Sequence, residues 1–95
     1  MMEVSVMSTA DRWSVELSIR EHEGETHADA RLIMNDDAHL LGHGRARRHP
    51  SDPNVTEIGE KIAVARALSD LAHTLLGSAA AQIEDITHEQ AQLHM

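Results

Sequence analysis

Residues 40–47, LLGHGRAR, alternate between two kinds of side chain, and this alternation decides how the chain folds. Gly42, Gly44 and Ala46 would lie on one face of a strand, because successive side chains of a strand point to opposite faces. A strand face without side-chain bulk leaves room for a helix to lie close against it. The opposite face would carry Leu41, His43, Arg45 and Arg47. We therefore expect a strand over residues 40–47 that packs closely against a helix.

Two further strands are predicted upstream of this one. Residues 13–20 and 27–32 both alternate apolar or small side chains with polar ones, which is the period-two pattern of half-buried strands. Gly24 and the sequence NDDA at 35–38 supply turn residues between the strands. The inward-facing residues would be Trp13, Val15, Leu17, Ile19, Ala28, Ala30 and Leu32. Because the connections are short, the three strands should form an antiparallel meander.

Helical periodicity follows the strands. Both prolines lie in residues 49–56, and beyond them apolar residues recur with a period of 3.6. Gly77 is a natural C-terminal cap, and Ser78 would begin a second helix. Arg66 and Asp70 have the spacing of an ion pair along a helix. The predicted apolar helix face comprises Ile58, Ile62, Ala65, Leu68, Ala72, Leu75 and Leu76.

These elements predict an α+β fold of the order β-β-β-α-α, with two helices on one face of the sheet. One domain would span residues 12–88, between a flexible leader (1–11) and a polar tail (89–95). A chain of this size has little stability in reserve, so burial of Trp13, its single aromatic residue, should matter most. The predicted core consists of Trp13, Val15, Leu17, Ile19, Leu32, Ile58, Ile62, Leu68, Leu71 and Leu75.

The composition excludes several kinds of function. The chain has no cysteine, so disulfides, thiol catalysis and cysteine-based metal sites are excluded, and a reducing cytoplasm fits. Its sixteen acidic and eight basic residues give a formal charge of −8, which opposes non-specific binding to nucleic acid. Residues 1–10 have no apolar run of a secretory signal, and no stretch is long enough to span a membrane. We expect a cytoplasmic protein without a cofactor.

Histidine and acidic side chains do not form a recognisable metal or catalytic motif. His22 and His27, with Glu23 and Glu25, straddle a predicted turn rather than one helical face. His39 and His43 would share a strand face, but about 13 Å apart, too far to bind one ion. Ser69 next to Asp70 lies within a helix, without the strained turn of a catalytic nucleophile. The sequence therefore predicts no metal site, no catalytic residues and no small-molecule substrate.

The arginine cluster at the end of the third predicted strand has two interpretations. Its members, Arg45, Arg47, Arg48 and His49, could grip phosphate groups, for which the arginine fork is suited. Alternatively, they pair with Glu16 and Asp29 across the sheet, or protect an exposed strand edge by their charge. An open three-stranded sheet also has two edges, and pairing with a second copy would cover one of them. We therefore expect a homodimer.

Three segments resemble a known family: RWSVELSIREHEG (12–24), GRARRHPSD (44–52) and EIGEKIAVARALSDLA (57–72). The family comprises small actinobacterial proteins of unknown function, including dormancy-induced mycobacterial members, and the resemblance covers about residues 12–88. It implies a compact fold like that of double-stranded-RNA-binding domains, a dimer, and a likeness to ribosome hibernation factors. No catalytic residues come with it. The expected function is a non-enzymatic stress protein associated with the ribosome or its RNA; the alternative is an acidic protein–protein interaction module.

Overall fold

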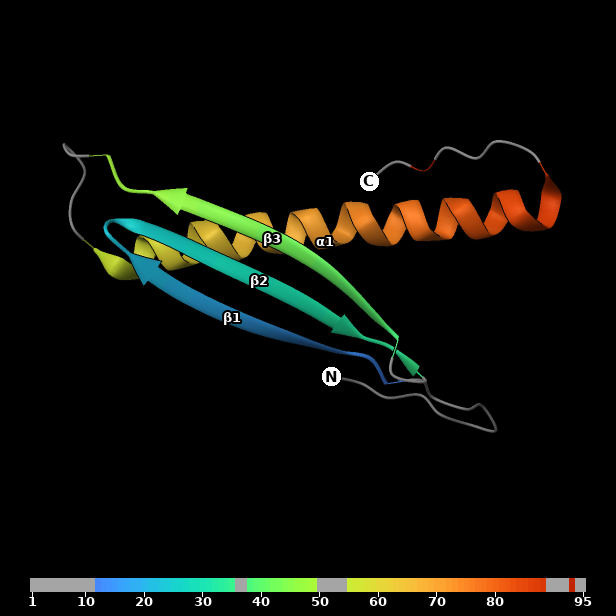
Figure 1. Cartoon of the computed structure of the whole chain (residues 1–95), viewed down its shortest axis with the longest axis horizontal. Coiled ribbons are helices and arrows are strands. Elements are labelled where there is room, and N and C mark those ends of the chain that lie inside the picture. The colour runs from blue at the N-terminus through green and yellow to red at the C-terminus, as the bar shows by residue number, and fades with distance from the viewer. Residues whose placement is uncertain (1–11, 36–37, 50–54, 89–92, 94–95) are drawn as a thin grey trace, which may run out of the picture.

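The structure is a computed structural model that describes residues 12–35, 38–49, 55–88 and 93. Strands β1 (Ser14–His22), β2 (Glu25–Ile33) and β3 (His39–Arg47) form an antiparallel sheet in the order β1-β2-β3. Helix α1 (Thr56–Thr87) lies along one face of this sheet, mainly over β2 and β3, and continues beyond the strands (Figure 1). The predicted α+β fold with a three-stranded antiparallel meander is confirmed.

The connections match the turn residues of the sequence. Glu23 and Gly24 join β1 to β2, and both have positive φ, at 50° and 76°. A two-residue hairpin turn of type I′ needs this geometry at both central positions, which is why glycine is favoured there. Between β2 and β3 the Met34 amide donates to the Ala38 carbonyl. Asp36 and Asp37 of this second turn lie outside the described residues, as do the predicted leader and most of the predicted tail.

The structure has one long helix where the sequence predicted two. Helix α1 runs through Gly77 and Ser78 without a break and ends at His88, whose left-handed backbone (φ 61°) provides the cap. A glycine inside a helix costs only about 1 kcal/mol relative to alanine. Here the strong helix formers at 79–81 follow it directly, so the helix continues. The predicted stop at Gly77 is therefore wrong.

Small residues make the contact between α1 and the sheet. Gly42 and Gly44 face the helix, and a Cβ on Gly44 would collide with backbone atoms of Ala63 and Ala67. The side chains of the helix that face the sheet recur every four residues. This small-residue contact buries Ala28, Ala30, Leu32, Ala46, Ala63, Ala67 and Leu71. The close approach predicted from residues 40–47 is thus present, and the core is built largely from alanine.

The predicted core of large apolar residues needs correction. Leu32 and Leu71 are buried and Leu75 is partly buried, but the other predicted members are exposed. The reason is that α1 makes little contact with β1 and approaches β3 on its small residues, which leaves the large side chains at the flanks of the helix–sheet contact. The exposed members are Trp13, Val15, Leu17, Ile19, Ile58, Ile62 and Leu68.

Two side chains on one flank of α1 bind backbone groups at the free edge of β3. Arg66 donates from Nη1 to the Arg45 carbonyl at 2.7 Å, and Asp70 accepts the His43 amide on Oδ2 at 2.8 Å. The sequence predicted that Arg66 and Asp70 pair with each other; each instead contacts backbone groups that no neighbouring strand uses. These contacts satisfy hydrogen-bonding groups of an edge strand, which otherwise tend to pair with another chain.

Replacing Asp70 should leave the His43 amide at this strand edge without its acceptor and destabilise the fold. Asp70→Ala removes a charged acceptor from the His43 amide, and we expect a loss of about 1.5 kcal/mol in the free energy of unfolding. Urea denaturation measures the loss, and hydrogen exchange should show faster exchange at the His43 amide. Asp85→Ala, an exposed carboxylate in the same helix, is the control and should be near neutral. Unchanged exchange at His43 would contradict the contact.

Candidate functional site

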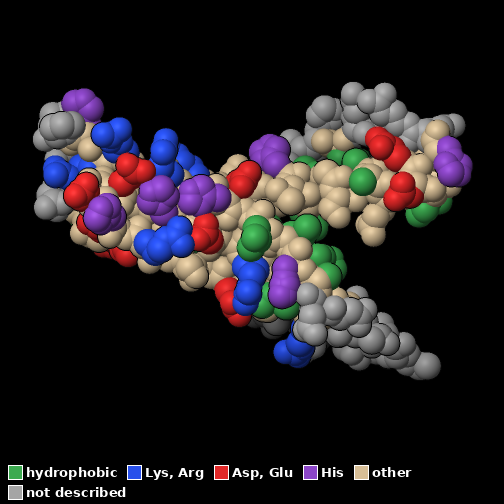
Figure 2. Space-filling model, viewed as in Figure 1, with side chains coloured by type: hydrophobic (Ala, Val, Ile, Leu, Met, Phe, Trp, Pro, Cys, Tyr) green, Lys and Arg blue, Asp and Glu red, His purple; other side chains and the backbone are tan. Residues whose placement is uncertain are grey.

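The face of the sheet that points away from α1, here called the outer face, carries interspersed charges (Figure 2). It holds more arginines than acidic residues, although the chain as a whole has a formal charge of −8. Its ion pairs are Arg31–Glu16 at 2.8 Å, Arg20–Asp29 at 3.0 Å and Arg45–Glu25 at 3.6 Å. The charged and histidine side chains of this face are Glu16, Arg20, His22, Glu25, His27, Asp29, Arg31, His39, His43, Arg45 and Arg47.

The predicted contact residues lie at one end of β3. Arg45 pairs with Glu25, which lies at the same end of the sheet, whereas one of the two interpretations of the sequence paired the arginine cluster with Glu16 and Asp29. Arg47 and Arg48 are exposed where β3 ends, and the Arg48 amide donates to the Gly24 carbonyl at 2.9 Å. His49 follows them and is also exposed. The structure therefore groups the basic residues beside the β1–β2 turn.

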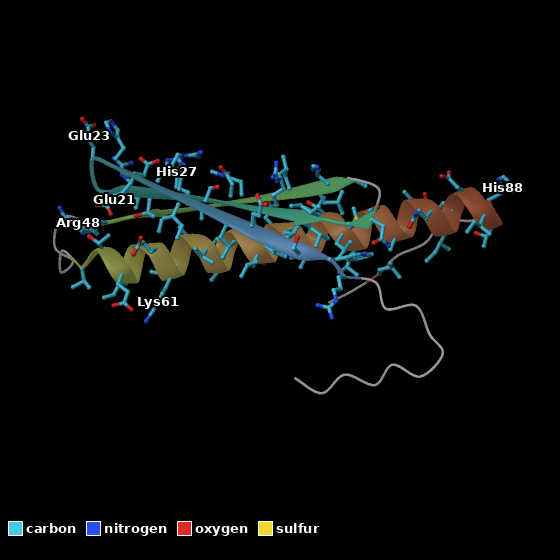
Figure 3. All side chains as sticks on the ribbon, turned by 90° about the horizontal axis from the view of Figure 1, so that it is seen from below. Glu21, Glu23, His27, Arg48, Lys61 and His88 are labelled. Atoms are coloured by element: carbon cyan, nitrogen blue, oxygen red, sulfur yellow. The ribbon has the colours of Figure 1, made fainter. Side chains whose placement is uncertain are left out.

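A cavity of about 330 Å³ adjoins these arginines. It lies between the β1–β2 turn, the end of β3 and the first turns of α1, at the end of the molecule where Figure 3 shows Glu21, Glu23 and Arg48. Its inner wall is mostly apolar, formed by Ala46, Ile58 and Ile62, and its polar groups include those of Thr26 and Arg47. Thr26 is a polar residue that is 5% exposed. Glu21 and Arg48 also line the cavity, so its apolar wall is bordered by side chains of both charge signs.

Two histidines on the outer face are each held by a carboxylate. His27 Nε2 lies 2.9 Å from Glu25 Oε1, and His43 Nδ1 lies 2.8 Å from Asp29 Oδ1. The hydrogen bond from His43, together with the nearby Arg20 guanidinium, lowers the pKa of Asp29 against an opposing effect of burial. Asp29 thus stays ionised under acidic conditions that protonate an ordinary aspartate.

The lowered pKa of Asp29 predicts a dependence of stability on pH. A carboxyl group with a depressed pKa in the folded state contributes stability above its unfolded pKa and loses it as the pH falls through the folded pKa. The stability difference between wild type and Asp29→Asn should therefore be full near pH 7 and shrink below about pH 4. Urea denaturation across this range measures it. A carboxyl resonance of Asp29 that titrates at or above its usual value of 3.8 would contradict the prediction.

The inner side of β1 forms a second candidate site. Its residues Trp13, Val15, Leu17 and Ile19, here called the β1 row, are 43–50% exposed although they alternate as a buried strand face would. A groove of about 390 Å³ separates Ile19 from the flank of α1 and is lined almost entirely by apolar surface. The α1 side of the groove is formed by Glu57, Glu60, Lys61, Val64, Ala65 and Leu68. Continuous exposed apolar surface of this kind is typical of an interaction site.

Several contacts that follow from the register of β2 and β3 were not predicted from the sequence. The β2–β3 register places Asp29 opposite His43 and His27 opposite Arg45, so His27 and His43 are diagonal neighbours on the outer face. Counting the residues of the two strands back from the turn would have found this proximity. The contacts of Arg66 and Asp70 with β3 had no such signal, because they depend on which face of α1 meets the sheet.

Comparison with known proteins identifies similar chains in mycobacteria. The sequence model of the Rv2632c-like family matches residues 11–92. An uncharacterized protein of Mycobacterium bovis, Mb1767, is 49% identical over 81 residues, covering 85% of each chain. The uncharacterized protein Rv2632c of Mycobacterium tuberculosis is 41% identical over 75 residues, covering 79% of this chain and 80% of its own. A solved structure titled "Crystal Structure of Rv2632c" superposes with a TM-score of 0.77 at 37% identity, covering 88% of this chain and 99% of that one. In the described part of the chain, no helix has the length and apolar character needed to cross a membrane.

Proposed function

Because the chain belongs to the Rv2632c-like family, whose relatives above are uncharacterized, we propose its function from its own surfaces. It acts as a non-enzymatic cytoplasmic homodimer in which two copies pair through β1, and it serves under stress or dormancy by associating with the ribosome or its RNA. The observation that carries the dimer is the β1 row, an apolar strand face that α1 leaves uncovered.

The isolated chain buries too little apolar surface to be strongly stable alone. Among the residues that the structure describes, no large side chain is fully buried, and five of the seven core residues are alanine. Fully burying one branched or aromatic side chain contributes about 1.5–3 kcal/mol relative to leaving it exposed. Covering the β1 row would therefore add substantially to the stability of the fold.

A second copy fits the β1 edge because that edge is self-complementary. The amides and carbonyls of Val15, Leu17 and Ile19 point away from β2, since neighbours along a strand alternate in hydrogen-bonding direction and the intervening residues face β2. Two such edges related by a two-fold axis pair in an antiparallel manner. The β1 rows of both copies then form one apolar surface on the helix side of a continuous sheet.

Sedimentation over a range of concentrations tests the dimer. We expect a species of twice the 10.5 kDa chain mass at micromolar concentration and a melting temperature that rises with protein concentration. A monomer at every concentration would contradict the proposal.

The arginines at the end of β3 support association with RNA. Arg47 and Arg48 are consecutive exposed residues that line the cavity at the end of β3, and the outer face as a whole carries four arginines against three acidic residues. Arginine binds phosphate in a bidentate manner, and two copies in a dimer would present two such sites. The family resemblance to ribosome hibernation factors and to double-stranded-RNA-binding domains supports the same role.

Co-sedimentation with ribosomes across a salt series tests the RNA association. We expect the wild type to travel with ribosomes at low salt and to be released as salt rises, since phosphate contacts depend on counterion release. The triple variant Arg45→Glu, Arg47→Glu, Arg48→Glu should remain folded and leave the ribosome fraction, whereas Arg12→Glu, outside the cluster, should behave as wild type. If the wild type never co-sediments, the ribosomal role fails. Capture of a basic protein partner that is insensitive to these changes would instead support the acidic protein–protein interaction module.

A further inference from the structure

Two histidine rings meet on the outer face with one ring nitrogen of each close to the other. His27 Nδ1 lies 3.4 Å from His43 Nε2, and the ring centroids are 5.4 Å apart. His27 projects from β2 away from α1, on the opposite side of the molecule from Lys61 (Figure 3). His43 comes from the neighbouring strand, β3, diagonally across the pair.

The carboxylates fix which nitrogen of each ring carries hydrogen. Glu25 accepts from His27 Nε2 and Asp29 accepts from His43 Nδ1, because an ionised carboxylate can only accept. In two neutral imidazoles the remaining nitrogens, His27 Nδ1 and His43 Nε2, are then both lone-pair acceptors. Two lone pairs this close to each other repel, and a cation bound by both nitrogens removes that repulsion.

The spacing of these nitrogens suits a metal ion. Two imidazole nitrogens bound at 2.0–2.1 Å to one tetrahedral ion lie about 3.3–3.4 Å apart. Histidine ligands of metals usually donate their other N–H to a carboxylate, which fixes the ring and raises its basicity. His27 and His43 both have this partner. The two side chains are 31% and 50% exposed, so the site is accessible from solvent.

The charges around the histidine pair are balanced. Arg45 lies 3.6 Å from Glu25 and Arg20 lies 3.0 Å from Asp29, so each carboxylate is shared between an arginine and a histidine.

Among the described residues, no group of three or more His, Asp or Glu side chains is placed to hold a metal ion. The pair would therefore supply two ligands and leave the remaining positions to water.

We propose that His27 and His43 form a two-histidine site for a divalent transition-metal cation, with Glu25 and Asp29 as its supporting carboxylates. Imidazole ligands suit Zn²⁺, Cu²⁺ and Ni²⁺ rather than Mg²⁺ or Ca²⁺, and Cu²⁺ should bind most tightly. The proposal does not use the β1 row, and it shares with the proposed RNA contact only Arg45, which pairs with Glu25.

Calorimetric titration of the full chain with ZnCl₂ and, separately, CuCl₂ tests this site. His43→Ala and His27→Ala should each weaken the strongest binding at least about tenfold, and Asp29→Asn should weaken it about 10–100-fold. The matched control is His39→Ala, on the same strand and the same face, which should bind as wild type does. Equal affinities of wild type and His43→Ala would overturn the proposal.

Nitrogen resonances of the wild-type histidines provide a readout that needs no variant. Zn²⁺ should shift His27 Nδ1 and His43 Nε2 and leave His27 Nε2 and His43 Nδ1 protonated. A shift at other histidines with none at these two nitrogens would show that the metal binds elsewhere. A proton shared between the two rings that persists at saturating Zn²⁺ would likewise contradict the proposal.

Discussion

Gly44→Ala should cost about 3 kcal/mol or more of the free energy of unfolding. Overpacking a core usually costs about 1–3 kcal/mol, because neighbouring side chains can shift. At Gly44 the obstacles are the Ala63 carbonyl and the Ala67 amide, which belong to the helix backbone. Relief requires α1 to move away from β3 as a unit, and that movement would also pull Arg66 and Asp70 from the strand edge. Urea denaturation monitored by circular dichroism measures the loss.

Gly77→Ala is the matched control for this substitution. Gly77 lies in the same helix that contacts Gly44, yet a Cβ there meets nothing within 4 Å. We expect a gain of about 1 kcal/mol, since alanine is the better helix former. If Gly44→Ala and Gly77→Ala had similar effects, the close approach of α1 to β3 would be contradicted.

Leu17→Lys should convert the proposed dimer into monomers. Leu17 is in the middle of the β1 row and is 46% exposed in the single chain, so lysine is tolerated there when no partner is present. In a dimer paired through β1, the ammonium group of each copy would stand among the apolar side chains of both β1 rows, which is unfavourable. We expect the dimer dissociation constant to rise at least about 100-fold, equivalent to about 2.7 kcal/mol.

Ser18→Lys places the same charge on the next residue of the strand. Its side chain points to the outer face, away from the β1 row, so the dimer should persist. Sedimentation equilibrium distinguishes the two variants, and the melting temperature of Leu17→Lys should no longer depend on concentration. A dimer that survives Leu17→Lys would exclude the β1 row as the interface.

Patterns within a strand predicted the sheet well, because alternation and turn chemistry are local properties. The strand ends differ from the expected ones by only a few residues, and Gly24 takes the positive φ that its turn needs. The close approach of a helix to Gly42 and Gly44 was also readable from residue size.

The helix and the core were harder to predict, because they depend on which surfaces meet. Ile58, Ile62 and Leu68 follow a helical period, and large apolar residues are expected in a core. Strand β3 has glycine at positions 42 and 44, where it packs against α1. The closest contact between helix and strand is therefore made by alanines of the helix. For the outer face, alternation within each strand predicts which side chains lie there, and the proximity of His27 to His43 follows only when the residues of β2 and β3 are also counted back from their turn.

The two edges of the sheet differ, and this difference limits how many copies can join. The β3 edge has its His43 amide and Arg45 carbonyl bound by α1, whereas the β1 edge faces outward with its apolar row exposed. A sheet with two open edges can add neighbours indefinitely and grow into a fibre. In the proposed dimer, a two-fold contact through β1 would occupy the open edge of both copies at once. The assembly would close at two chains, and strand addition could proceed no further.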